Sequence, residues 1–331
     1  MMRQPIVVLV GHIDHGKSSI LEHIKNISIT KKEAGGITQS LHSYTIPLTR
    51  LEECCNTLVQ RNHMKITLPG LLFLDSPGHA AFNTMRKRGG SLADLAILVI
   101  DCTKGVEEQT QECIKILKQY KTPFIIALNK VDKIEGWKSH RELSLLESLS
   151  SQNEKTIEEL EVRLYGIVEK LSQCGIQADR FDRIDDFTKT VAIVPVSAKT
   201  EDGLSELVMV LIGLAQKFLE TSLKTKAGGL GKATILEVAE EPGIGTTLDV
   251  VVYEGSVKVN DQIVIGTLGE PLVTKVRALF EPNEKEKKLK AVKEVHAASG
   301  VRVIAPELGG VIGGMPLQVV PKGGSLSEAK K

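Results

Sequence analysis

The residues Gly11, Gly16, Lys17 and Ser18 have the types and the spacing of a loop that binds phosphate. They lie in the stretch GHIDHGKSS, directly after the apolar run IVVLV and before a helical pattern. Glycines let the backbone curl so that successive N–H groups converge on phosphate oxygens, and the N-terminus of the following helix adds positive potential. Lys17 would neutralise the β and γ phosphates, and the Ser18 hydroxyl would bind Mg²⁺. The alternative, a plain glycine turn, is disfavoured by the strand before the loop and the helix after it. The predicted phosphate-binding residues are Asp14, His15, Gly16, Lys17, Ser18 and Ser19.

Two later motifs, NKVD and SAK, each follow an apolar strand and address the base of a nucleotide. The Asp132 carboxylate can accept hydrogen bonds from guanine N1–H and its 2-amino group, whereas adenine has neither donor. Asn129 would either face the O6/N7 edge of the base or brace the phosphate loop, and the stem of Lys130 can lie on the base plane. The backbone N–H of Ala198 would meet guanine O6. The alternative for NKVD alone is a turn with a helix N-cap, and the combination of motifs disfavours it. The predicted base-binding residues are Asn129, Lys130, Asp132, Ser197, Ala198 and Lys199.

The stretches LFLDSPGHAAF and GGIT supply residues for a metal ion and for a switch. Asp75, at the end of a strand, can hold Mg²⁺ through water. Gly78 can offer its N–H to the γ phosphate, and His79 can orient an attacking water, although a purely structural histidine is the alternative. Thr38 of GGIT could close over the γ phosphate and complete the Mg²⁺ shell, the alternative being a flexible loop. The sequence therefore predicts Ser18, Thr38 and Asp75 as metal ligands, with Gly78 and His79 as catalytic residues.

The motifs are positioned by continuous apolar strands that alternate with helices, which predicts a parallel sheet buried on both faces. Helical spacing is found at Glu107–Gln119 and in EKTIEELEVRLYGIVEKLSQCG, where Gly175 is the expected stop. The expected strands are Ile6–Val10, Leu71–Leu74, Leu95–Ile100, Phe124–Leu128 and Val191–Val196.

The pattern changes at the Gly/Lys-rich stretch KTKAGGLG, after which short β-branched runs alternate with turns. This predicts an antiparallel β-barrel, in which the charged run EKEKKLKAVKEV is expected to form a solvated loop or a short helix. We therefore expect a P-loop α/β domain at 1–223, a β-barrel domain at 224–320, and a disordered tail or the start of a linker at 321–331.

Composition excludes several classes of protein. The net charge of +1 and the 4% aromatic content argue against a general nucleic-acid binder. The five cysteines are odd in number and include no C-x-x-C, which indicates reduced thiols rather than zinc or disulfides. No apolar run reaches the roughly 20 residues of a membrane span. A cytoplasmic protein without a membrane partner is expected.

The motifs GHIDHGKS, GGIT, DSPGH, NKVD and SAK, in this order, resemble those of the translational GTPases. Longer stretches such as PGLLFLDSPGHAAF and ATILEVAEEPGIGTTLDVVVYEG resemble the archaeal and eukaryotic translation initiation factor 5B family. The resemblance covers about Pro5 to Pro321. Serine stands at Ser18 and Ser76 where that family usually has threonine. The family's third domain, connecting helix and fourth domain are missing, which indicates a fragment.

The resemblance implies GTP and GDP as ligands, Mg²⁺ as the metal, and ribosome-triggered hydrolysis during the joining of ribosomal subunits. It also implies that Asp14 holds a monovalent cation, K⁺ or Na⁺, between the β and γ phosphates as part of the catalytic apparatus, and that Ile13 belongs to an apolar gate near His79. The side chains of His12 and His15 gain no role. The implied partners are the ribosome and other initiation factors, with initiator tRNA reached only through the missing domains, and the chain is expected to be a monomer.

Two other functions compete with a GTP-hydrolysing translation factor. A GTP-binding adaptor that does not hydrolyse would use the same motifs with His79 idle. An ATP-dependent enzyme is disfavoured by Asp132.

Overall fold

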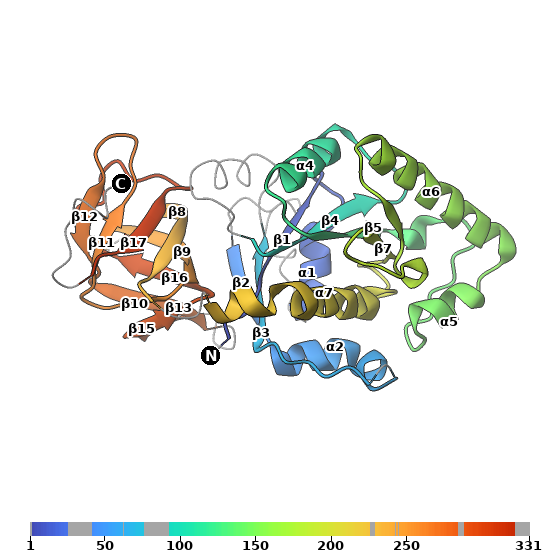
Figure 1. Cartoon of the computed structure of the whole chain (residues 1–331), viewed down its shortest axis with the longest axis horizontal. Helices are drawn as coiled ribbons and strands as arrows, with labels where there is room; N and C mark the ends of the chain where they lie inside the picture. The colour runs from blue at the N-terminus through green and yellow to red at the C-terminus, as the bar shows by residue number, and fades with distance from the viewer. Residues whose placement is uncertain are drawn as a thin grey trace.

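The computed structural model describes residues 2–25, 42–61, 63–75, 93–225, 229–241, 243, 245–283 and 288–321. Figure 1 shows two parts, an α/β part whose last helix ends at Thr225 and a β part whose first strand begins at Lys232. Three predicted site residues lie outside the described residues: Thr38, Gly78 and His79.

The α/β part is built on a seven-stranded sheet in which only the edge strand β2 runs antiparallel to its neighbour. Strands β1, β3 and β4 are buried along their whole length, as their uninterrupted apolar sequences predict. Across the sheet the order is β2 (His42–Pro47), β3 (Gly70–Asp75), β1 (Ile6–Gly11), β4 (Leu95–Asp101), β5 (Phe124–Asn129), β7 (Val191–Pro195) and β6 (Ala178–Arg180).

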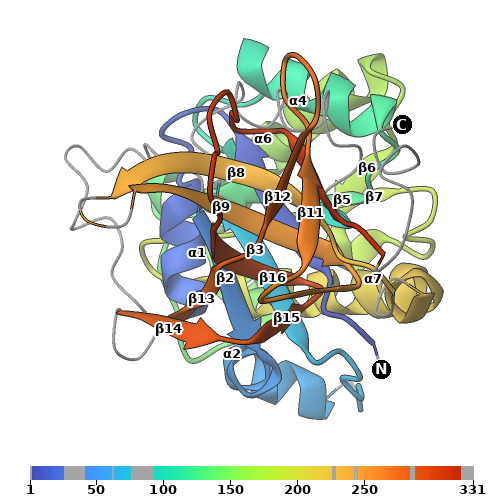
Figure 2. The same cartoon turned by 90° about the vertical axis from the view of Figure 1, so that its left-hand side faces the viewer.

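Helices cover both faces of this sheet. Figures 1 and 2 show α4 and α6 on one side and α2 and α7 on the other. The predicted stop at Gly175 follows the last turn of α6 and has a φ of 69°. No helix in the described residues has the length and apolar character that crossing a membrane requires. The helices are α1 (Lys17–Lys25), α2 (Leu48–Arg61), α4 (Glu108–Gln119), α5 (Leu145–Ser150), α6 (Glu154–Gln173) and α7 (Leu204–Thr225), with short 3₁₀ helices η3 (Val131–Lys133) and η4 (Phe181–Arg183).

The β part consists of antiparallel strands around a second apolar core, to which Ile235, Val250 and Val303 belong. Together with the parallel sheet, this confirms the predicted fold class. The eight-stranded sheet has the order β12 (Leu272–Lys275), β11 (Gln262–Ile265), β17 (Pro316–Val319), β8 (Lys232–Glu241), β9 (Gly245–Glu254), β16 (Ser299–Ile304), β13 (Ala278–Asn283) and β14 (Lys288–Val292), and β10 (Ser256–Lys258) pairs with β15 (Glu294–His296).

One local prediction was wrong. The charged run EKEKKLKAVKEV, expected to be a loop or a short helix, contains β14 and the start of β15. Strand β14 pairs with β13 and lies last in the sheet order. Exposed lysines are common on edge strands because charge discourages pairing with other chains, so a charged sequence is compatible with a strand there.

The two parts contact each other through β2 and β16. Gln4 Nε2 donates a hydrogen bond to the Ala298 carbonyl at 2.6 Å. Ala298 and Val251 of the β part are buried in the same apolar cluster as the α/β core. Gly300 in β16 faces Ser43 in β2 so closely that a Cβ atom there would lie 1.7 Å from Ser43 Oγ. We propose 1–223 and 224–320 as the domains; the tail at 321–331 is described only at Pro321.

Candidate nucleotide-binding site

The phosphate loop connects β1 to α1, and its two glycines are held against neighbouring segments. Gly11 has a φ of 142°, and a Cβ atom there would lie 2.3 Å from the Val99 carbonyl oxygen of β4. Gly16 has a φ of 92°, and a Cβ atom there would lie 2.3 Å from Asn129 Nδ2. Only glycine fits both the backbone angle and the space at these positions, so the spacing of the two glycines is fixed by the fold.

Lys17, the first residue of α1, curls back over the loop. Its ammonium group donates hydrogen bonds to the carbonyls of Gly11 at 3.1 Å and His12 at 2.8 Å. The residue is only 8% exposed, and burial lowers the Lys17 pKa, while the nearby Asp75 carboxylate acts in the opposite direction. The cation is therefore fixed at the loop.

Ser18 and Asp75 meet where α1 begins and β3 ends. The Ser18 hydroxyl donates a hydrogen bond to Asp75 Oδ2 at 3.0 Å, and Asp75 is 1% exposed. Mg²⁺ takes oxygen ligands, often one carboxylate beside substrate phosphates and water, and this hydroxyl and carboxylate fit that preference.

Asn129 joins the phosphate loop to the SAK motif. Its side-chain Nδ2 donates to the His15 carbonyl at 2.8 Å, and its Oδ1 accepts from the Ala198 backbone N–H at 3.0 Å. Asn129 is 1% exposed. Asn129 was expected either to face the base or to brace the phosphate loop, and these hydrogen bonds correspond to the second role. The Ala198 N–H, predicted to meet guanine O6, donates to Asn129.

Asp132 and Ser197 form a second link between NKVD and SAK. The Ser197 hydroxyl donates to Asp132 Oδ1 at 2.6 Å and accepts from the backbone N–H groups of Lys199 at 3.3 Å and Thr200 at 3.1 Å. Because Ser197 is fully buried, it orients a carboxylate that is itself partly exposed. Such a carboxylate retains capacity to accept hydrogen bonds from a ligand.

Lys130 connects the same motif to the phosphate loop. It has a φ of 68°, and its ammonium group donates to the Asp14 carbonyl at 2.5 Å and pairs with Asp101 Oδ2 at 2.8 Å. Sequence reasoning missed Asp101, although its position directly after the apolar run LAILVI marks the end of a parallel strand. Burial would raise the Asp101 pKa, but the hydrogen bonds from Lys130 and Thr103 leave that pKa below its ordinary value.

The structure thus brings together the predicted residues of four segments at the carboxyl ends of β1, β3, β5 and β7, the usual edge for ligands in such sheets. They are Asp14, His15, Gly16, Lys17, Ser18, Ser19, Asp75, Asn129, Lys130, Asp132, Ser197, Ala198 and Lys199.

Comparison with known proteins decides the family. Residues 2–217 match the family model described as the elongation factor Tu GTP binding domain. That match covers all seven strands of the first sheet and ends within α7. The chain belongs to this family. It is a translational GTPase, and the class of enzyme predicted from the motifs is confirmed.

The relatives are longer than this chain. The chain is 48% identical over 333 residues to a protein of Methanopyrus kandleri named probable translation initiation factor IF-2, and 46% identical over 337 residues to one of that name from Sulfurisphaera tokodaii. These alignments cover 99% and 100% of this chain and 56% of each relative. The chain therefore spans about half the length of the curated relatives that it matches.

Solved structures agree with both parts of the fold. GDP-bound aIF5B from Aeropyrum pernix matches with a TM-score of 0.88 at 44% identity, covering 99% of this chain and 55% of that one. A bacterial selenocysteine-specific elongation factor matches with a TM-score of 0.63 at 20% identity, covering 97% of this chain and 45% of the other. The second likeness concerns the fold alone.

Proposed function

We propose that this GTPase is part of a translation initiation factor that binds GTP and GDP with Mg²⁺ and hydrolyses GTP when the ribosome triggers it, during the joining of ribosomal subunits. The observation that carries the proposal is the Asn129 brace. It holds the phosphate loop against the SAK loop, with the partly exposed Asp132 carboxylate beside it. The names of the relatives support the place of the reaction in initiation.

The described residues of the site have different roles in this proposal. The loop N–H groups and Lys17 would hold the phosphates, and Asp132 would select guanine over adenine. Ser18 and Asp75 would hold Mg²⁺, which neutralises charge that develops on the phosphates. Asp14, exposed at the tip of the loop, is the proposed carrier of a monovalent cation.

Three residues outside the described part complete the proposal. Thr38 would add a metal ligand, Gly78 would detect the γ phosphate, and His79 would orient the attacking water. The ribosome and other initiation factors are the proposed partners, and initiator tRNA would be reached only by domains beyond this sequence. We propose a cytoplasmic monomer.

Release of phosphate from GTP, measured with and without ribosomes, tests the proposal. Lys17→Ala should abolish nucleotide binding, because it removes the cation from the phosphates. His79→Ala should bind GTP nearly as the parent does, yet turn over on the order of 10²-fold more slowly or worse with ribosomes, the scale of positioned proton transfer. His296→Ala, which changes an exposed histidine of the β part, is the control.

Equal ribosome-stimulated turnover in the parent and His79→Ala would show that His79 has no catalytic role. No ribosome-stimulated phosphate release by the parent, with GTP binding intact, would instead favour the GTP-binding adaptor.

A further inference from the structure

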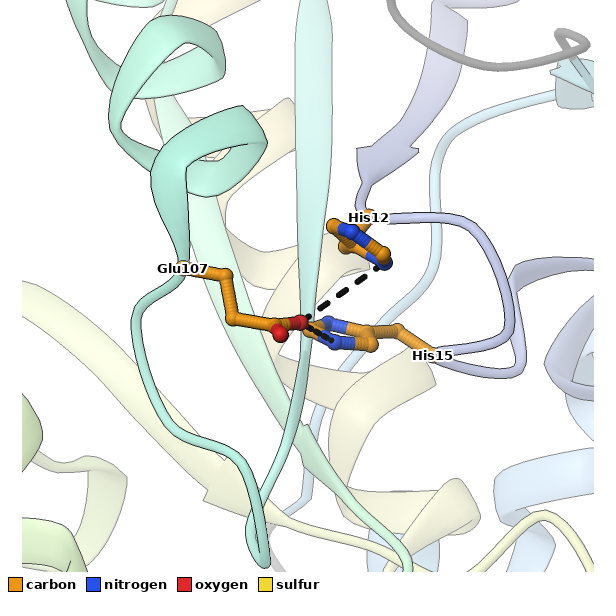
Figure 3. Close-up of side chains that lie close together, drawn as sticks. All are labelled: His12, His15 and Glu107. Atoms are coloured by element: carbon orange, nitrogen blue, oxygen red, sulfur yellow. Dashed lines mark hydrogen bonds and ion pairs between the residues drawn. The ribbon is translucent and has the colours of Figure 1, made fainter.

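A group of side chains behind the phosphate loop has no part in the nucleotide site described above. His12 and His15 project from the loop toward Glu107, the residue before α4 (Figure 3). Glu107 Oε2 lies 2.8 Å from His15 Nε2 and 3.6 Å from His12 Nδ1, and the two imidazole rings have centroids 5.0 Å apart. One ligand atom from each residue falls within 4.8 Å of the others. Two segments that are more than 90 residues apart in sequence thus offer two nitrogens and a carboxylate to one point.

The surroundings of His15 suit a metal ligand. Its side chain is fully buried, and burial lowers the His15 pKa, so the ring is held neutral, the form that binds metal ions. Its second nitrogen, Nδ1, lies 3.3 Å from the Val99 carbonyl oxygen, to which it donates when protonated, and 3.3 Å from the Asp101 backbone nitrogen, whose N–H it accepts when unprotonated. A metal-bound histidine usually donates its other N–H to such a carbonyl. If Nε2 binds an ion, the proton lies on Nδ1 and faces Val99, and this hydrogen bond replaces the one that Nδ1 accepts from the Asp101 N–H.

Glu107 supplies a negative charge, and both Glu107 and His12 are accessible to an ion from solvent. The side chains of His12 and Glu107 are 26% and 34% exposed, so an ion can reach the group from solvent. The hydrogen bond from His15 is the main cause that lowers the Glu107 pKa, which keeps this carboxylate ionised. His12 Nδ1 also lies 2.6 Å from the Ile13 carbonyl, and binding an ion would exchange that hydrogen bond for a metal bond.

We propose that His12, His15 and Glu107 form a binding site for Zn²⁺ or a chemically similar divalent transition-metal ion. Ligand atoms bound tetrahedrally to Zn²⁺ at 2.0–2.1 Å are about 3.3 Å from one another. The distances from Glu107 Oε2 to His15 Nε2, 2.8 Å, and to His12 Nδ1, 3.6 Å, lie on either side of that value. Two imidazoles and one carboxylate favour transition metals, whereas Mg²⁺ prefers oxygen ligands. Water would take the fourth position.

Such an ion would link the phosphate loop to the start of α4. It would use only side-chain atoms, so the backbone N–H groups of the loop stay available to phosphates. Because the ion and a nucleotide would then require the same loop conformation, each would strengthen the binding of the other, by the reciprocity of linked equilibria.

Calorimetric titration of the full chain with Zn²⁺ tests the site. The chain is first treated with a chelator and kept reduced, and it is titrated without nucleotide so that the result does not depend on the proposed function. Replacing Zn²⁺ by Co²⁺ reports the ligands: absorption bands of a tetrahedral site without sulfur charge transfer identify nitrogen and oxygen ligands, and thereby exclude the cysteines.

We expect His12→Ala and Glu107→Gln each to lose one equivalent of Zn²⁺ or to weaken its binding on the order of 10-fold or more, since loss of even an outer-shell partner costs 10–100-fold. Glu108→Gln, one residue along, and His296→Ala, an exposed histidine 3.7 Å from Glu294, are the matched controls and should bind as the parent does. Thermal unfolding shows whether each variant folds.

Equal stoichiometry and affinity in the parent, His12→Ala and Glu107→Gln would overturn the proposal and leave a hydrogen-bonded triad alone. Co²⁺ spectra with sulfur charge transfer that persist in both variants would overturn it as well. A repeat with saturating Mg²⁺·GDP should give equal or tighter Zn²⁺ binding. Competition between the two ligands would overturn the inference that the ion leaves the loop backbone free.

Discussion

Asn129 holds the phosphate loop and the loop after β7 with a single amide group. Both halves of the amide are engaged, the nitrogen with His15 and the oxygen with Ala198, and the side chain is almost fully buried. Gly16 is required because a Cβ atom there would collide with the same amide. The NKVD motif therefore shapes the phosphate loop, in addition to its proposed role in binding a base.

Replacing Asn129 by alanine should weaken the nucleotide site without touching the ligand. The change leaves the His15 carbonyl and the Ala198 N–H without this partner, and each buried unsatisfied group costs about 1–3 kcal/mol. We expect a lower free energy of unfolding and at least about 10-fold weaker binding of Mg²⁺·GDP, measured by denaturant unfolding and fluorescence titration. Asn153→Ala, at an exposed N-cap that makes no side-chain capping bond, is the control. Unchanged affinity in Asn129→Ala would contradict the brace.

Asp132 is the residue that we propose selects the base, and this role can be tested by a change in which nucleotide is bound. Asp132→Asn replaces an acceptor with a group that can donate, so the variant should lose GTP and gain xanthosine triphosphate, whose C2 carbonyl needs a donor. The Ser197 hydroxyl can still donate to the amide oxygen, which keeps the side chain in place. Competition binding with both nucleotides provides the measurement, and undiminished GTP affinity would show that the base pocket is assigned to the wrong residue.

At the scale of elements, continuous apolar runs and helical spacing were sufficient to predict β1, β3, β4, β5, β7, α4 and α6. Strand β2 and helix α2 were missed. In β2, an edge strand, Ile46 is the one buried residue among the described side chains, so its sequence lacks a continuous apolar run. Strand β14 was missed because its charge suggested a loop.

At the site, the motifs predicted residues that the structure places at one edge of the sheet, but the partners of these residues were harder to find. Asp101 pairs with Lys130, and Glu107 meets His15 from 92 residues away. Such contacts depend on which strand ends are neighbours in the sheet, and local sequence patterns do not contain that information.

Helices α5 and α7 are joined by a buried carboxylate, which gives this region a dependence on pH. Glu206 of α7 is 4% exposed and accepts the Leu145 N–H at the start of α5 at 2.6 Å. Burial raises the Glu206 pKa, and repulsion from Asp202 and Glu147 adds to the shift. Because the Glu206 pKa is higher in the folded protein than in the unfolded chain, folding favours the protonated carboxyl group. The contribution of Glu206 to stability is therefore greatest below the ordinary glutamate pKa of about 4.3, and it is lost as the pH rises through the raised value.

Glu206→Gln should therefore be more stable than the parent at pH 7.5, and this advantage should shrink as the pH falls toward 4.5. The amide oxygen still accepts from Leu145, while the buried charge is gone. Thermal unfolding midpoints of both proteins across this range provide the measurement, with the exposed Glu158→Gln as the control. An advantage that grew on acidification would have the wrong sign for a raised pKa.

At the scale of the whole molecule, the contact between β2 and β16 fixes how the β part meets the GTPase sheet. The contact is tight at one point, where the Ser43 side chain occupies the space that a Gly300 side chain would need. The Gln4 hydrogen bond to Ala298 and the buried Val251 extend the contact around that point. Because closely packed contacts tolerate little added volume, a single methyl group is a sensitive probe of the arrangement.

Gly300→Ala should destabilise the molecule by about 1–3 kcal/mol, the usual cost of overpacking. The added Cβ atom would meet Ser43 Oγ at 1.7 Å and Ser43 Cβ at 2.7 Å, so rotation of the hydroxyl alone cannot relieve the collision. Ser43→Gly removes the two closest of the three neighbouring atoms and leaves only the Ser43 Cα, at 4.0 Å. The double variant should therefore recover most of the stability that Gly300→Ala loses, apart from the roughly 0.5–1 kcal/mol cost of glycine in a strand.

Gly309→Ala, with no atom within 4 Å of its added Cβ, is the control and should unfold as the parent does. Scanning calorimetry of the parent, the two single variants Gly300→Ala and Ser43→Gly, and the double variant gives the coupling between the two positions. Strictly additive effects would show that β2 and β16 are not in contact in solution.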